Sequence, residues 1–122
     1  MKRTFFIAGV QFRPKNEIAE AGKILKQGDL LRLIPEPTNK FDSNAVMITL
    51  PIEEEQKELF LGYVPKKFSS EVAGMLSIGA PIGCIVEVVN PAAKTYEMFK
   101  VTVQIPEDEE YEEPDMIEEG DK

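Results

Sequence analysis

The amino-acid sequence predicts a mainly β domain, a small and partly closed antiparallel barrel that carries two short helices. Six short segments rich in branched and aromatic residues have the length of strands, and closely spaced turns separate them. Two further segments repeat apolar residues at helical spacing. Closing the sheet would protect the edge strands that an open sheet leaves unpaired. A flat α+β sandwich is the alternative that the same pattern allows.

The first half of the chain is predicted to form a strand, a helix and two more strands. Residues 4–12 have the composition of a strand, and residues 17–26 show helical spacing. Gly28 ends this helix and turns the chain. Residues 30–34 and 45–50 are short apolar runs with branched side chains, which indicates the second and third strands.

The second half repeats this arrangement after a polar turn. Residues 59–64 are predicted to form the fourth strand, and residues 65–79 a helix with Pro65 near its start. Residues 81–89 and 97–105 are predicted to form the last two strands. The expected order is therefore β-α-β-β-β-α-β-β.

The net charge of −8 is concentrated at one end of the chain. Residues 106–122 contain ten acidic residues and one lysine, a net charge of −9, which leaves residues 1–105 with a net charge of +1. The acidic segment has no apolar periodicity, so we expect it to be disordered in isolation. The chain therefore divides into a folded domain, 1–105, and an acidic C-terminal tail, 106–122.

Several residues and motifs that enzymes commonly use for catalysis are missing. The chain has no histidine, and its single cysteine, Cys84, lies in an apolar run without a partner that would activate it. Phosphate-binding glycine loops, nucleophile elbows and zinc-binding helix motifs are absent. We expect a binding module without catalytic residues, cofactor or metal. One cysteine and no apolar run of membrane-spanning length favour a cytoplasmic protein that makes no membrane contact.

The connection over residues 35–44 is longer than a hairpin turn and carries polar, charged and aromatic groups. Two interpretations stay open. In the first, Asn39, Asp42 and Asn44 cap backbone donors. Phe41 then fills a gap in the packing. In the second, Phe41 stacks on a nucleic-acid base and Asp42 accepts a sugar hydroxyl. A carboxylate repels phosphate, so this second interpretation points to the free end of a strand.

Two other positions add candidate binding groups. Phe12 supplies a second ring beside Arg13, although the ring could equally belong to the core. Lys66 and Lys67 lie at the start of the second predicted helix, where lysines and free amides can hold a phosphate. The alternative is that both lysines are simply exposed.

Four blocks of this sequence resemble the HIRAN domain family. They are GVQF at 9–12, GDLLRL at 28–33, EPTNKFDSNAV at 36–46 and LGYVP at 61–65, within a match over about residues 5–105. The resemblance implies an OB-like β-barrel. Members of this family occur fused to Swi/Snf-type helicases in fork-remodelling proteins, and as small stand-alone bacterial and phage proteins. The helicase-fused members bind the 3′-hydroxyl end of single-stranded DNA.

The resemblance also implies roles for individual residues. Asp42 would contact the terminal hydroxyl, and Phe41 and Phe12 would hold the bases. Asn39 would brace the pocket or form a hydrogen bond with the terminal nucleotide. The implied activity is binding of single-stranded DNA or DNA ends in repair or in processing of stalled or damaged DNA. A separately encoded protein would supply any helicase or nuclease. The full set of expected DNA-binding residues is Gln11, Phe12, Arg13, Asn39, Lys40, Phe41, Asp42, Asn44, Lys66 and Lys67.

Two other hypotheses are kept. Phe41 and Phe12 stand where well-studied members of the family have tyrosine, and Gln11 replaces an arginine. A protein-interaction module that has lost the DNA pocket, and that works through its surface and acidic tail, would fit these changes. A hydrolase that uses carboxylates and a divalent metal is the third hypothesis. If DNA does bind, the acidic tail would compete with it for basic residues, and removing the tail would raise the affinity at low salt.

Overall fold

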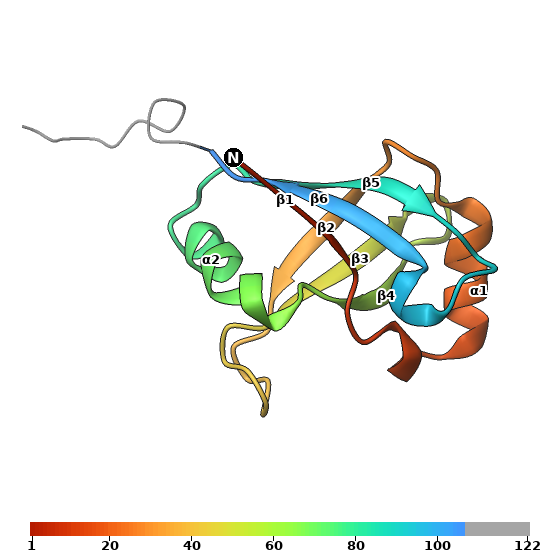
Figure 1. Cartoon of the computed structure of the whole chain (residues 1–122), viewed down its shortest axis with the longest axis horizontal. Helices are drawn as coiled ribbons and strands as arrows, with labels where there is room; N and C mark the ends of the chain where they lie inside the picture. The colour runs from red at the N-terminus through yellow and green to blue at the C-terminus, as the bar shows by residue number, and fades with distance from the viewer. Residues whose placement is uncertain (107–122) are drawn as a thin grey trace, which may run out of the picture.

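The computed structural model describes residues 1–106 and contains six antiparallel strands and two α-helices in the predicted order (Figure 1). The predicted mainly β fold is therefore confirmed, whereas the acidic tail lies, from residue 107 onward, outside the described residues. The elements are β1 (Lys2–Phe6), η1 (Val10–Phe12), α1 (Lys15–Ile24), β2 (Leu30–Pro35), β3 (Val46–Ile52), η2 (Glu53–Glu55), β4 (Lys57–Tyr63), α2 (Lys66–Ser77), β5 (Gly83–Val89), η3 (Thr95–Glu97) and β6 (Phe99–Gln104), where η denotes a short 3₁₀-helix.

The strands form one sheet in the order β1-β6-β5-β2-β3-β4. Its two edges meet just beyond β1, where Ala8 and Tyr63 exchange backbone hydrogen bonds of 2.9 and 2.8 Å. Because this single pair of residues joins the two edges without a continuous ladder of hydrogen bonds, the sheet is curled but not closed into a complete barrel. This arrangement agrees with the predicted partly closed, OB-like form.

Gly62 makes this contact between the edges possible. A Cβ atom at this position would lie 2.3 Å from the carbonyl oxygen of Ala8 and 2.7 Å from Cγ2 of Ile7. Only a residue without a side chain allows the backbones to approach this closely.

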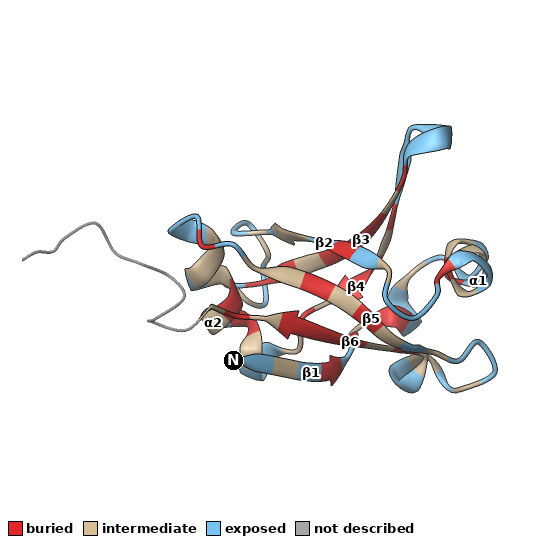
Figure 2. Ribbon diagram, turned by 90° about the horizontal axis from the view of Figure 1, so that it is seen from above, coloured by how far each residue is buried: buried red, intermediate tan, exposed pale blue. Residues whose placement is uncertain are grey.

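Most core residues lie on the strands, and the two helices lie at opposite ends of the sheet (Figures 1 and 2). Alternate residues of β6, such as Val101 and Val103, are fully buried, as expected for strands with one face toward a core. Helix α2 packs through Val72 and through Phe68, whose ring stacks on that of Phe5 with centroids 5.5 Å apart.

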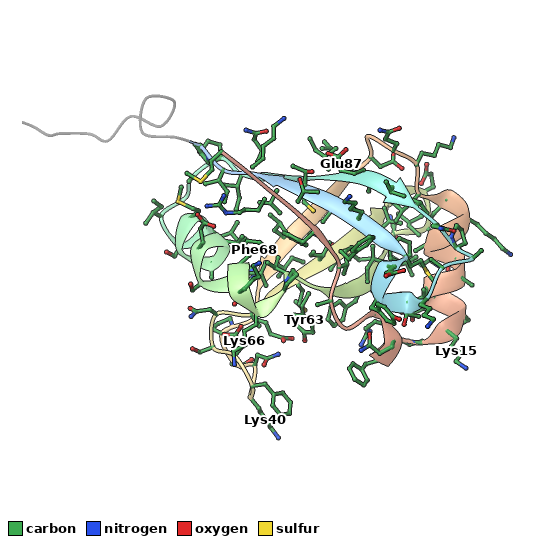
Figure 3. The ribbon with its side chains drawn as sticks, viewed as in Figure 1. Lys15, Lys40, Tyr63, Lys66, Phe68 and Glu87 are labelled. Carbon is green, nitrogen blue, oxygen red and sulfur yellow. The ribbon has the colours of Figure 1, made fainter. Side chains whose placement is uncertain are left out.

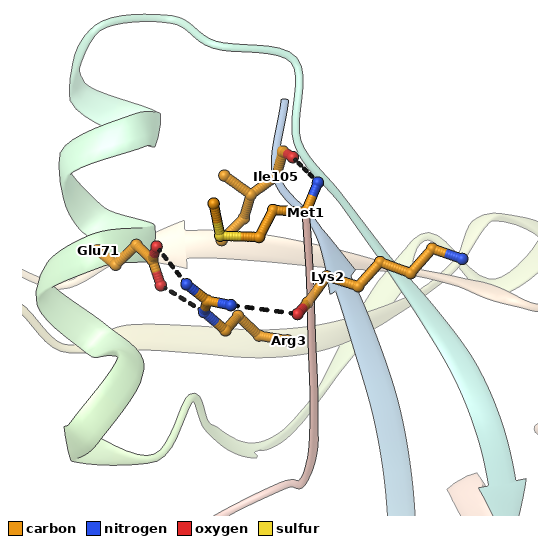
Figure 4. Close-up of polar contacts among 5 residues, drawn as sticks. All are labelled: Met1, Lys2, Arg3, Glu71 and Ile105. Carbon is orange, nitrogen blue, oxygen red and sulfur yellow. Dashed lines mark hydrogen bonds and ion pairs between the residues drawn. The ribbon is translucent and has the colours of Figure 1, made fainter. Parts of the chain in front are cut away.

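Polar contacts fasten β1 to its surroundings (Figure 4). The Nε and Nη2 atoms of Arg3 donate to the two carboxylate oxygens of Glu71 in α2, at 2.8 and 3.0 Å. The amino group of Met1 donates to the carbonyl of Ile105 at 2.9 Å. The N-terminal strand is thus held by both a helix and the end of β6.

Several predicted boundaries were wrong. The first helix ends at Ile24, with Leu25 already extended, and not at Gly28. The first strand ends at Phe6 instead of Phe12, because Gly9 adopts a left-handed conformation (φ 76°) and turns the chain into η1, which starts at Val10. Strand β3 runs on through Pro51 to Ile52, past residue 50, where the predicted strand ends. The ladder between β2 and β3 ends at the pair of Arg32 and Thr49, so the missing N–H of Pro51 costs no hydrogen bond to β2.

Candidate nucleic-acid interface

The loop between β2 and β3 is held in one shape by its own hydrogen bonds. At its base, the amide of Glu36 donates to the carbonyl of Ala45 at 2.8 Å. At its tip, the side-chain oxygen of Asn39 accepts from the amides of Phe41 and Asp42 at 2.9 and 3.0 Å. The capping that the first interpretation predicted is therefore present for Asn39.

A second group of bonds joins this loop to β4. The hydroxyl of Tyr63 donates to Oε1 of Glu36 at 2.7 Å, and the side-chain amide of Asn39 donates to the same oxygen at 2.8 Å. Partial burial, together with the hydrogen bond to Glu36, raises the pKa of Tyr63 above its ordinary value. Both Glu36 and Tyr63 lie in blocks that carry the family resemblance, but neither is among the binding residues predicted from the sequence.

Asp42 anchors the far side of the loop. Its Oδ1 accepts from the amide of Asn44 at 2.9 Å, and its Oδ2 accepts from the hydroxyl of Ser69 in α2 at 2.7 Å. These two hydrogen bonds hold the pKa of the Asp42 carboxyl below its usual range, and the bond from Ser69 has the larger effect. Desolvation opposes this lowering of the pKa, and the positive charge of Lys66 adds to it. An ionised carboxylate has about four acceptor positions, so room remains for a ligand hydroxyl.

The two candidate rings are both exposed. The residue Phe41 is 89% exposed and Phe12 is 81% exposed. Phe41 therefore does not fill a gap in the loop, and Phe12 does not belong to the core. Both rings line one hollow, and apolar groups exposed together at one site are typical of a binding surface.

These groups surround one hollow, which we call the aromatic pocket. Its volume is about 440 Å³, and loop 36–45, η1, β4 and the start of α2 form its walls. The residues that line it are Ala8, Gly9, Phe12, Arg13, Asn39, Phe41, Asp42, Ala45, Phe60, Tyr63, Val64 and Lys66. Six of the ten expected binding residues are thus brought together from three separate parts of the chain.

Arg13 is fixed against the wall of the pocket. Its guanidinium lies 4.0 Å from the centroid of the Phe60 ring, and its Nε donates to the carbonyl of Phe60 at 3.1 Å. The Phe60 ring in turn meets Tyr63 edge-on, with centroids 5.2 Å apart. Sequence reasoning missed Phe60, since a ring in a predicted strand has no pattern that separates a site wall from a core residue.

Four expected residues do not line the aromatic pocket. Gln11 faces a neighbouring groove, and Asn44 borders a different hollow beside α2. The Lys67 amine lies 5.0 Å from the ring of Phe68. Lys40 is exposed at the tip of the loop, whereas Lys66 lies nearer the pocket (Figure 3).

The other sequence expectations concern metals, membranes and the thiol. No group of three potential metal ligands occurs among residues 1–106. Within the same part of the chain, no helix is long and apolar enough to cross a membrane. Cys84 is buried in β5, and desolvation raises its pKa to about 12, as expected for a structural thiol.

Comparisons with known proteins identify the family and similar folds. The model of the HIRAN domain family matches residues 3–106. The crystal structure of the HIRAN domain of human HLTF superposes with a TM-score of 0.60 at 13% identity, covering 84% of this chain and 72% of that one. A crystal structure of a Lactobacillus plantarum protein gives a TM-score of 0.66 at 18% identity, covering 84% and 95%. A search of curated proteins gives no match.

Proposed function

The chain belongs to the HIRAN domain family, and from this premise we propose that it binds single-stranded DNA and recognises a free 3′-hydroxyl end in the aromatic pocket. One observation carries the proposal. The exposed rings of Phe12 and Phe41, which lie far apart in the sequence, line the same hollow as the ionised carboxylate of Asp42. Rings of this kind stack on bases of any sequence.

The charges around the pocket favour a strand end. Asp42 would repel a phosphate at its own position but would accept a hydrogen bond from a sugar hydroxyl. Arg13 and Lys66 place positive charge on the walls, where the backbone phosphates of the preceding nucleotides would lie. Helix α2 begins at Lys66 without a side-chain cap, so its free amides add to this attraction.

The wider role follows from the family resemblance. We infer a cytoplasmic binding module for repair or for processing of stalled or damaged DNA, which leaves catalysis to a helicase or nuclease encoded separately. In this proposal residues 1–105 are the folded unit, and the acidic tail lowers the affinity for DNA at low salt.

The test compares two oligonucleotides of one sequence, one ending in a 3′-hydroxyl and the other in a 3′-phosphate, by fluorescence anisotropy. We expect a preference for the hydroxyl end that is lost in Asp42→Ala. Asp29→Ala is the control, because Asp29 also accepts a backbone hydrogen bond in a loop, from the amide of Lys26, but lies outside the pocket. Equal binding to both ends would contradict end recognition. Absence of binding, even after removal of the acidic tail, residues 106–122, would favour the protein-interaction hypothesis.

A further inference from the structure

A second hollow, which we call the lysine groove, lies on the other side of η1 from the aromatic pocket. Its volume is about 460 Å³, and η1, α1 and the turn before β6 border it. We propose that the lysine groove holds the nucleotides that precede the terminal ones in the same DNA strand. This inference rests on the proposed function and extends its site from a strand end to a longer track.

The position of the groove makes it continuous with the pocket. Arg13 lines both hollows. Along η1, Phe12 borders the aromatic pocket, whereas Val10 and Gln11 border the lysine groove. A strand that leaves the pocket past Arg13 would therefore enter the groove directly.

The rim of the groove suits a polyanion. Lys15 and Lys23 of α1 line it, and neither forms an ion pair among residues 1–106. Figure 3 shows Lys15 projecting from α1 into open space. Helix α1 contains two acidic residues, Glu17 and Glu20, and neither of them lines the groove. Glu20 forms an ion pair with Lys57 at 3.1 Å. The positive charge of the rim is thus available to phosphates.

The floor of the groove suits bases. Val10, Ile18, Pro91 and Met98 give it a mostly apolar surface, against which the faces of bases can pack. Folds that bind single strands without sequence preference combine such a surface with a basic track and cover about 4–16 nucleotides. An acidic peptide with apolar side chains would also match this chemistry. We favour DNA because the groove shares Arg13 with the pocket.

The experiment measures affinity against length, using 3′-hydroxyl oligonucleotides of two, four and six nucleotides. We expect affinity to rise with length in the native chain. In the double variant Lys15→Glu/Lys23→Glu, the dinucleotide should bind nearly as before, whereas the gain with length should disappear. For the hexamer, the logarithm of the binding constant decreases as the logarithm of the salt concentration rises. The magnitude of this slope should be smaller by about 1.4 in the double variant, or roughly 0.7 for each lost phosphate contact.

Two controls separate a track from general electrostatic attraction. The double variant Lys2→Glu/Lys26→Glu makes the same change in net charge at exposed positions that line neither hollow. In this variant the affinity should still rise with oligonucleotide length, nearly as in the native chain. Ala19→Leu narrows the groove without changing charge, because exposed Ala19 lines it, and should reduce binding of the hexamer only.

Two outcomes would overturn the inference. They are equal losses of affinity in the two double variants and no rise of affinity with length in the native chain. Failure of the proposed function is distinguishable. It would appear as equal binding of dinucleotides ending in a 3′-hydroxyl or a 3′-phosphate, whatever the effect of length.

Discussion

The hydroxyl of Ser69 lies 2.7 Å from Oδ2 of Asp42, so a residue of α2 orients the carboxylate at the tip of the loop between β2 and β3. Ser69 is only 2% exposed. It also lies 3.0 Å from the carbonyl of Lys66, which fixes its rotamer. The loop is therefore positioned by the helix that forms the opposite wall of the pocket, and this contact would keep Asp42 in place before a ligand arrives.

Replacing Ser69 by alanine should raise the pKa of Asp42, because the hydrogen bond from Ser69 is the largest cause of its lowered value. A carboxyl whose pKa is lowered by folding stabilises the protein above its unfolded pKa of about 4, and this contribution is lost as the pH falls through the folded pKa. In Ser69→Ala the loss of stability below about pH 4 should therefore be smaller. NMR titration of the Asp42 carboxyl measures the shift, and Ser70→Ala on the exposed side of α2 should leave it unchanged.

Removing either exposed ring should weaken DNA binding with little effect on folding. Phe41→Ala and Phe12→Ala should each cost about 1–3 kcal/mol of binding free energy, the value of stacking one base. Their free energies of unfolding should change by less than about 0.5 kcal/mol, because both rings lie in solvent. Phe6→Ala is the control for DNA binding, since this partly exposed ring lies outside both hollows. A weakening by Phe6→Ala as large as that by Phe41→Ala would contradict the assignment of the pocket.

Gly62→Ala should destabilise the fold by about 1–3 kcal/mol, the usual cost of overpacking. The added methyl would lie 2.3 Å from the carbonyl oxygen of Ala8 and would separate the two edges of the sheet. Gly74→Ala in α2 is the matched control, because a methyl there meets nothing within 4 Å and should stabilise the helix by roughly 0.5–1 kcal/mol. Urea unfolding of the two variants measures the difference, and equal stability of both would show that the edges do not meet at Gly62.

Cys84 should resist thiol reagents in the folded protein. Its side chain is fully buried and its pKa is raised to about 12, so at pH 8 only on the order of 1 in 10⁴ molecules would carry a thiolate. Labelling with a chromogenic disulfide should be slow under native conditions and fast in urea. Rapid native labelling would mean that β5 opens readily or that the thiol is exposed.

The periodicity of the chain was sufficient for the order of the elements. Branched residues in strand-length runs and apolar residues at helical spacing predicted each strand and helix, and all eight formed in sequence. The motif blocks predicted the family, and six of the expected binding residues line one pocket. These features are local, since they depend on residues that are neighbours along the chain.

The shape of the site was decided only by the tertiary structure. The sequence did not reveal that Gly9 would end the first strand and expose Phe12, because a left-handed glycine leaves no periodic pattern. It did not assign Ser69, Phe60 or Tyr63 to the site, since each meets its partner only after the sheet curls and α2 packs on it. The sequence by itself therefore determined the elements and the family, through local periodicity and motif blocks. Long-range packing decided which side chains share a pocket, because that depends on where the backbone brings distant residues together.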